Sequence, residues 1–160
     1  MSLQKTILAE EQKVLFYDPE KCSGCLFCVI ACSFYHFGEI SLEKSHVEVF
    51  SDLDRTAYFI SAHCAHCEFP ACESACPVNA IKKDPEKGIV KINTMECIGC
   101  KACNFGCPIS IPHYDSAAKV SYKCDLCDGD PWCVKFCTTG AIQYLPRKEA
   151  RKLVKTKTKT

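Results

Sequence analysis

Sixteen cysteines in four groups of four constrain this chain more than any other feature. They make up one tenth of the 160 residues, and none lies outside a group. Usage this high requires a chemical reason, and the candidates are disulfides, zinc and iron–sulfur clusters. The groups are Cys22, Cys25, Cys28 and Cys32; Cys64, Cys67, Cys72 and Cys76; Cys97, Cys100, Cys103 and Cys107; and Cys124, Cys127, Cys133 and Cys137.

The N-terminal residues argue against disulfides. They contain no apolar h-region, no small-residue cleavage site and no twin arginine. No run of about 18 apolar residues occurs, so we expect no membrane-spanning segment. We therefore expect a cytoplasmic chain, in which thiols stay reduced. Export on a signal-bearing partner stays open.

The cysteine spacing favours 4Fe-4S clusters. Groups one and three read C-x2-C-x2-C-x3-C, while groups two and four widen the second gap and keep the final x3. Three thiolates at gaps of three can each bind a different iron of one cubane. Gly24 and Gly99 permit the tight turn that this requires. The fourth cysteine faces away on the next helical turn and is expected to ligate the other cluster of a pair.

Zinc is the competing interpretation of the same cysteines. Four tetrahedral zinc sites with four cysteines each would also use sixteen thiolates, but zinc sites pair C-x2-C knuckles across a longer stretch. A zinc site does not need a third cysteine soon after a C-x2-C pair, whereas a 4Fe-4S cluster needs it to bind a third iron. The spacing therefore favours iron–sulfur clusters, and assays of iron and acid-labile sulfide discriminate between the two.

Internal repeats predict short elements around the cysteine loops. Residues 22–28 match 97–103, and residues 76–81 match 137–142. We expect a strand at 14–17 to pair with one at 141–145. Residues 108–123 are expected to form a linker. The other expected elements are short helices at 29–34 and 102–106 and hairpins of 80–83 with 89–93 and of 46–50 with 57–61.

The predicted fold class is α+β, built from tandem, pseudo-symmetric two-cluster ferredoxin-like units with short strands, short helices and a β-hairpin insertion. Residues 1–146 would form a polyferredoxin body and residues 147–160 a basic C-terminal tail. The tail carries seven lysines and arginines against one glutamate, and we expect it to be mobile and solvated. Within the body, residues 12–36 with 115–146 would form one two-cluster unit, 62–113 the other, and 37–61 the hairpin insertion.

Three further motifs carry a family resemblance. They are DPEKC at residues 18–22, CAHC at 64–67 and KCDLCDGDP at 123–131. With the four cysteine groups, they resemble the electron-transfer subunits of molybdenum and tungsten oxidoreductases, the family of the dimethyl sulfoxide reductase iron–sulfur subunit. The most similar branch is the small subunit of tungsten aldehyde oxidoreductases and the carbon-monoxide-dehydrogenase-associated ferredoxin.

The resemblance implies four 4Fe-4S clusters whose last ligands are exchanged between groups. Groups one and four would exchange their last cysteines, and groups two and three would do the same. The implied ligand sets, named here sites I to IV, are site I (Cys22, Cys25, Cys28, Cys137), site II (Cys124, Cys127, Cys133, Cys32), site III (Cys64, Cys67, Cys72, Cys107) and site IV (Cys97, Cys100, Cys103, Cys76).

Other residues receive weaker predictions. The histidines around Cys64 lack the two C-x-H pairs of a Rieske centre, so we expect His66 to pack or to hydrogen-bond a cluster. His36, His46 and His113 show no constellation and are expected to be surface or core residues. We expect Trp132 to pack against its cysteine loop. The side chains expected to shield clusters from water are Phe27, Val29, Ile30, Phe105, Ile109 and Ile111.

The function predicted from these features is electron transfer without catalysis. Every cysteine is assigned to a metal, and no G-x-G-x-x-G, P-loop or G-x-S-x-G motif occurs. The resemblance implies a relay between a catalytic subunit and another carrier, which would be a flavin subunit or a soluble ferredoxin. The catalytic subunit would carry tungsten or molybdenum and be of aldehyde-oxidoreductase or aromatic-CoA-reductase type.

Several alternatives to this function stay open. The chain could serve a carbon monoxide dehydrogenase, formate dehydrogenase or hydrogenase complex, or act as a free polyferredoxin. A zinc-binding nucleic-acid module is the alternative from another class. We expect no nucleic-acid partner, because no aromatic side chain in the basic tail offers a base a stacking surface.

Overall fold

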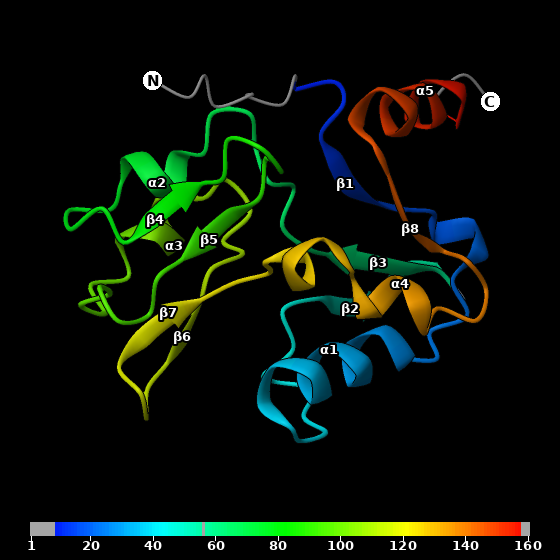
Figure 1. The fold of residues 1–160 in the computed structure, drawn as a ribbon. Coiled ribbons are helices and arrows are strands. Elements are labelled where there is room, and N and C mark those ends of the chain that lie inside the picture. Colours follow the sequence, from blue (N-terminus) through cyan, green and yellow to red (C-terminus); the bar gives the residue numbers. More distant parts are fainter. Residues whose placement is uncertain (1–8, 56, 158–160) are drawn as a thin grey trace.

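Short elements alternate with cysteine loops along the chain. The computed structural model describes residues 9–55 and 57–157, and Figure 1 shows their arrangement. The strands are β1 (Lys13–Tyr17), β2 (Glu48–Ser51), β3 (Phe59–Ala62), β4 (Ile81–Lys83), β5 (Val90–Ile92), β6 (His113–Asp115), β7 (Val120–Tyr122) and β8 (Ile142–Pro146). The helices are α1 (Phe27–Phe37), α2 (Ala71–Ser74), α3 (Ala102–Gly106), α4 (Trp132–Lys135) and α5 (Arg147–Lys157), with 3₁₀ turns η1 (Pro19–Lys21) and η2 (Leu126–Gly129).

The strands form four separate antiparallel pairs, β1–β8, β2–β3, β4–β5 and β6–β7. β1 pairs with β8 from Lys13 opposite Pro146 to Tyr17 opposite Ile142, so the expected pairing of these segments is confirmed. The two expected hairpins are also confirmed, as β2–β3 and β4–β5. A two-stranded sheet is marginally stable in water, so each pair depends on what packs against it.

The elements gather in two groups that do not follow chain order. In Figure 1, the middle of the chain, with α2, α3 and β4 to β7, lies to one side of the elements from the two ends of the described chain. Helix α1 packs on α4, and α2 packs on α3. Mixed short helices and small antiparallel strands make this an α+β fold of ferredoxin-like character.

Cysteines form part of the hydrophobic core. Six of the sixteen are buried. In the main core cluster, four of them lie among aliphatic side chains such as Leu15, Val29 and Ile142. The four are Cys28, Cys32, Cys124 and Cys133. The interior is therefore built around thiols as much as around aliphatic side chains.

The expected mobile tail is wrong for residues 147–157, which form α5. The Arg147 N–H donates to the Gln12 carbonyl oxygen at 2.8 Å, and Ala150 packs against Val14 and Phe16 of β1. Lysine, arginine, alanine and leucine, which make up most of this segment, are good helix formers. Residues 158–160 of the predicted tail lie outside the described residues.

The expected linker at residues 108–123 is also wrong, because it contains the β6–β7 hairpin. Tyr122 closes this hairpin opposite His113, and their rings stack 5.5 Å apart. Across residues 9–55 and 57–157, no helix combines the length and apolar character needed to cross a bilayer.

Candidate metal centres

The tight cysteine loops depend on glycines with left-handed backbone. Gly24 has φ +70° and Gly99 has φ +69°. A Cβ at Gly24 would lie 2.2 Å from the Phe59 ring, and one at Gly99 would lie 2.3 Å from the Lys119 carbonyl oxygen. Both the conformation and the crowding require glycine, as the sequence predicted.

The fold brings together cysteines from different groups. Three cavities are each lined by three cysteines of one group and the last cysteine of another. These linings contain the four cysteines of site I (Cys22, Cys25, Cys28, Cys137), of site III (Cys64, Cys67, Cys72, Cys107) and of site IV (Cys76, Cys97, Cys100, Cys103).

The fold also brings the four cysteines of site II together. Cys133 lies close enough to interact electrostatically with the thiols of Cys124, Cys32 and Cys127, and also with that of Cys28 in site I. Three of the four belong to the main core cluster. All sixteen thiols of the chain are free of disulfides.

Backbone N–H groups donate to at least one sulfur in every site. Hydrogen bonds to cluster sulfurs are one of the means by which a protein sets a reduction potential. The bonds run from Gly24 to Cys22 (3.4 Å) and Ile142 to Cys137 (3.5 Å) in site I, His46 to Cys32 (3.3 Å) in site II, His66 to Cys64 (3.4 Å) in site III, and Ala80 to Cys76 (3.3 Å) and Ser121 to Cys97 (3.4 Å) in site IV.

The protonation chemistry of these thiols fits a thiophilic metal. Burial raises the pKa of Cys28 to about 12 and the pKa values of Cys72 and Cys127 to about 11. Alone, such thiols keep their protons at neutral pH. Thiolates in these positions need cations close to the sulfur, which iron in a cluster supplies. The donor sets thus fit 4Fe-4S clusters.

Comparison with known proteins assigns the family. Residues 55–147 match the 4Fe-4S dicluster domain. This chain belongs to that family. The predicted iron–sulfur electron-transfer subunit with 4Fe-4S clusters is therefore confirmed, and the zinc alternative is set aside. Like its relatives, this dicluster protein is an electron-transfer subunit of an oxidoreductase and is not the catalytic subunit.

Relatives of this dicluster protein include named oxidoreductase subunits. It is 36% identical over 128 residues to the polyferredoxin-like subunit of aliphatic sulfonate oxidoreductase from Pyrococcus furiosus, over 80% of this chain and 73% of the relative. It is 34% identical over 154 residues to the B subunit of anaerobic dimethyl sulfoxide reductase from Escherichia coli, over 86% and 75%. It also matches the β subunit of NADH-dependent phenylglyoxylate dehydrogenase from Aromatoleum evansii, at 33% identity over 132 residues, spanning 81% of this chain but 29% of that relative.

Lys123 of the dicluster protein is a buried cation between two cysteine groups, and its role was not predicted from the sequence. It is 4% exposed. Its Nζ donates to the Cys64 Sγ at 3.4 Å, to the Cys124 carbonyl oxygen at 2.9 Å and to the Val90 carbonyl oxygen. A lysine directly before a cysteine group was the available sequence signal.

His66 is fully buried beside Cys64. Its Nδ1 accepts a hydrogen bond from the Val90 N–H at 3.0 Å, so the ring proton lies on Nε2. Burial, followed by the positive charges of Lys123 and Arg147, holds the pKa of His66 well below its usual value. Among the described residues, Nε2 has no hydrogen-bond partner, which leaves a donor available inside the protein.

Side chains from the two ends of the described chain hold the His66 loop. The Gln12 Nε2 donates to the carbonyl oxygens of His66 (2.8 Å) and Gly88 (2.6 Å). An Arg147 guanidinium N–H group donates to the carbonyl oxygens of Ala65 (3.1 Å) and His66 (2.8 Å). Residues before β1 and at the start of α5 therefore position a loop of site III.

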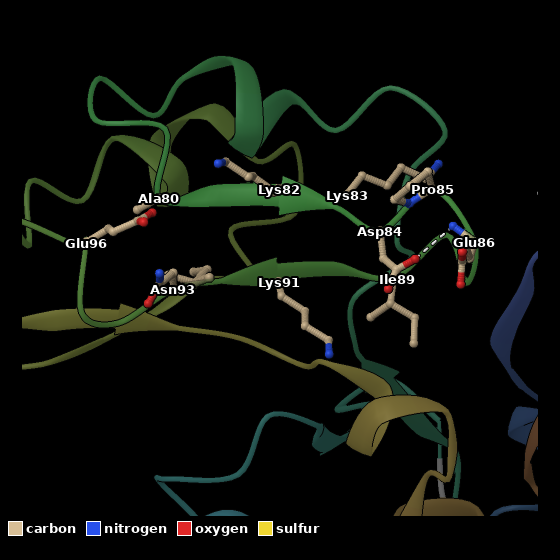
Figure 2. Close-up of a pocket in the computed structure, with 11 residues that line it drawn as sticks. Ala80, Lys82, Lys83, Asp84, Pro85, Glu86, Ile89, Lys91, Asn93 and Glu96 are labelled. Atoms are coloured by element: carbon tan, nitrogen blue, oxygen red, sulfur yellow. Dashed lines mark hydrogen bonds between the residues drawn. The ribbon is translucent and has the colours of Figure 1, made fainter. Parts of the chain in front are cut away.

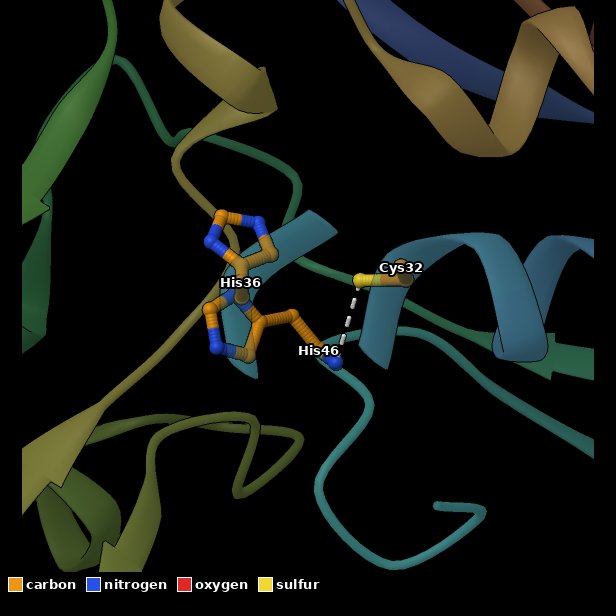
Figure 3. A group of neighbouring side chains, drawn as sticks. All are labelled: Cys32, His36 and His46. Atoms are coloured by element: carbon orange, nitrogen blue, oxygen red, sulfur yellow. Dashed lines mark hydrogen bonds between the residues drawn. The ribbon is translucent and has the colours of Figure 1, made fainter. Parts of the chain in front are cut away.

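The prediction that the histidines show no constellation is wrong for His36 and His46. Their rings lie 4.0 Å apart beside Cys32 (Figure 3). The His36 Nε2 lies 3.4 Å from the Asp125 Oδ1 and 3.9 Å from the Cys127 Sγ. Burial lowers the pKa of His46 to about 3. The two imidazole rings therefore pack beside the cysteines of site II. Only the folded structure brings these residues together, because they are distant in the sequence.

Some of the aromatic and aliphatic side chains expected to shield the clusters are buried, and others are exposed. Trp132 stacks on Phe136 at 5.6 Å, which fits the predicted packing role. Of the residues expected to exclude water, Val29 and Ile111 are buried. The expectation is wrong within this chain for Phe27 and Phe105, which are exposed at 49% and 85%. Ile109 is 59% exposed but lines the cavity of site III, as expected.

A wider hollow lies along the β4–β5 hairpin and contains no cysteine (Figure 2). Its wall is polar and of mixed charge, with Lys82, Asp84, Glu86 and Lys91 among the side chains. Lys91 is engaged in an ion pair with Asp128. The hollow therefore offers no redox chemistry of its own.

Proposed function

We propose that this chain relays electrons through four 4Fe-4S clusters held at sites I to IV. The observation that supports this most directly is the lining of the cavities, which combines three cysteines of one group with the last cysteine of another. When bound, each cluster takes up and releases one electron at a time. The chain supplies sixteen thiolates, the N–H groups that donate to them, and a core that keeps water away.

Two pseudo-symmetric units would carry the clusters in pairs. Residues 12–36 with 123–146 would hold sites I and II, residues 62–122 would hold sites III and IV, and residues 37–61 would be the hairpin insertion. The equal φ angles of Gly24 and Gly99 support the repeat, as does left-handed backbone at both Asn79 (φ 54°) and Gly140 (φ 66°). The boundary moves from residue 113 to residue 122 because Ser121 in β7 donates to Cys97.

The partner would be the catalytic subunit of a tungsten or molybdenum enzyme of aldehyde-oxidoreductase or aromatic-CoA-reductase type. The relative from Pyrococcus furiosus, a polyferredoxin-like subunit of an aliphatic sulfonate oxidoreductase, supports a subunit role. A flavin subunit or a soluble ferredoxin would be the second redox partner. Sixteen free thiols are suited to the reducing conditions of the cytoplasm, where we place the complex.

A hydrogenase complex is the second candidate, since a hydrogenase-2 operon protein of Escherichia coli O157:H7 is 32% identical over 170 residues. That match spans 52% of the relative's length. Purification from native extract with identification of the co-eluting large subunit decides between the candidates. Elution alone near 17.8 kDa would instead favour a free polyferredoxin.

Iron analysis tests the clusters, and paired substitutions test the ligand sets. The anaerobically purified protein should contain about sixteen irons and as many sulfides. If Cys64 and Cys107 hold the same cluster, then C64A combined with C107A should remove one cluster. C64A combined with C76A, the matched control pair, should remove two. The reverse order would show that each group closes on its own last cysteine.

A further inference from the structure

Lys123 is a cation without a carboxylate partner inside the protein. It is 4% exposed, and burial of an ammonium group is unfavourable unless the surroundings compensate for lost water. The acceptors of its Nζ are two carbonyl oxygens and the Cys64 sulfur. Among residues 9–55 and 57–157, no carboxylate forms an ion pair with it. The compensating negative charge must come from another source.

The position of this ammonium identifies that source. Cys64 and Cys124, which accept from Nζ, are the first cysteines of sites III and II. Lys123 also lines the cavity that contains the four cysteines of site III. A 4Fe-4S core with four thiolates carries a net charge of about −2 when oxidised and about −3 when reduced. Lys123 thus lies where two such anions adjoin.

We propose that Lys123 is an internal counter-charge that raises the reduction potential of the site III cluster. Because it bonds a sulfur of site III but only a carbonyl oxygen of site II, its effect on site II has the same sign and is smaller. The reduced state of site III is then more stable than it would be without Lys123. This inference depends on the cluster sites proposed above.

The physical basis is the extra negative charge of the reduced state. A fixed cation 3.4 Å from a ligand sulfur stabilises that state more than the oxidised one, and a buried charge is poorly screened by water and salt. One electron arrives from the donor and later leaves for the next carrier. Lys123 forms and breaks no covalent bond in either step.

Lys83 provides a matched comparison on the same site. Its Nζ donates to the carbonyl oxygens of Cys67 (2.9 Å) and Glu68 (3.1 Å), in the loop that also contains Cys64. It bonds no sulfur, and its side chain is half-buried at the surface. Removal of either positive charge should lower the potential of site III, and the proposal requires the larger shift to come from Lys123, which is buried and bonded to a ligand sulfur.

The test is a redox titration of the holoprotein monitored by electron paramagnetic resonance, with the site III signal assigned by its loss in C64A/C107A. In K123M, the ratio of reduced to oxidised site III cluster at a fixed potential should fall about tenfold, equivalent to about 59 mV for one electron. K123R should stay near the wild-type ratio, and K83M should shift less than K123M. A K123M ratio equal to wild type, or equal shifts in K123M and K83M, would overturn the proposal.

A measurement on the unmutated protein covers the case in which K123M fails to assemble. With lysine labelled by ¹⁵N, pulsed spectroscopy of the reduced site III cluster should detect coupling to one lysine nitrogen. Absence of this coupling would overturn the proposal. Failure of the underlying cluster assignment looks different, because the wild-type protein would then contain far fewer than about sixteen irons.

Discussion

Gly99 occupies a crowded turn in the cysteine loop of site IV, and its substitution by alanine tests whether glycine is required there. In G99A, the new Cβ would meet the Lys119 carbonyl oxygen at 2.3 Å in a left-handed conformation. We expect a loss of at least about 2 kcal/mol of unfolding free energy and preferential loss of the site IV cluster. Chemical denaturation and iron analysis of the holoprotein measure both effects.

Gly140 is the matched control for this substitution. It also has left-handed backbone (φ +66°), but no atom lies within 4 Å of the position that a Cβ would take. Asn79 holds the corresponding position after Cys76 with φ 54°, so G140N should be nearly neutral. Equal losses in G99A and G140N would show that crowding at Gly99 does not matter.

His46 makes the folded state sensitive to acid. Its folded pKa of about 3 lies below the usual 6.5, because of burial and then the charges of His36, His113 and Lys123. Between these values the unfolded chain binds a proton that the folded chain does not. This contribution to stability is therefore fully present above pH 6.5 and is lost as the pH falls toward 3, with a loss of about 1–2 kcal/mol by pH 5.5.

Substitution by phenylalanine isolates this contribution. H46F keeps an aromatic ring against His36 and removes the titration. Its unfolding free energy should therefore fall less than that of wild type between pH 7.5 and 5.5, and H113F serves as the comparison. The same fall in wild type and H46F would assign the acid sensitivity to other groups.

Local spacing made the cysteines and the two glycines predictable, since each loop is encoded within a few residues. Lys123, His36 and His46 were not predictable in this way. Their roles depend on contacts with residues far away in the chain, such as Cys64 with Lys123 and Asp125 with His36. A lone lysine or histidine carries no local pattern that separates a buried position from an exposed one.

At the scale of elements, alternation and turn residues predicted β1, β8 and two hairpins. The β6–β7 hairpin was missed because Pro108 and Pro112 indicated a linker, although its strands are as long as those of the predicted β4–β5 hairpin. Helix α5 was missed because its charge suggested solvated chain, whereas the buried side chain of Ala150 packs against β1. Short or highly charged elements are decided by their tertiary contacts and not by local pattern.

Helix α5 should protect site III from loss of iron. The Arg147 guanidinium group donates to two carbonyl oxygens of the loop at residues 65–66. R147M should lower the stability of this loop by about 1–2 kcal/mol and accelerate release of iron to a chelator, with site III losing its cluster first. R151M removes an exposed charge from the same helix and should release iron at the wild-type rate, and equal acceleration by both variants would assign the effect to net charge.

At the scale of the whole molecule, the clusters should be required for the fold. The strands form only isolated pairs, and six cysteines take the place of aliphatic core residues. Anaerobic removal of iron would leave buried thiols around unfilled space, so the chain should lose most of its far-ultraviolet circular dichroism. An iron-free protein that keeps its wild-type spectrum and amide protection would contradict this expectation.

The pairing of β1 with β8 has a consequence for biosynthesis. On the proposed ligand sets, sites III and IV need no cysteine after Cys107, whereas site I needs both Cys22 and Cys137. A ribosome adds the residues between Cys28 and Cys137 in a time on the order of 10 s. During this interval Cys22, Cys25 and Cys28 lack the fourth ligand of site I, and β1 lacks its partner strand β8. Metallation of the middle of the chain can therefore precede release of the polypeptide, and the protein matures from its centre outwards.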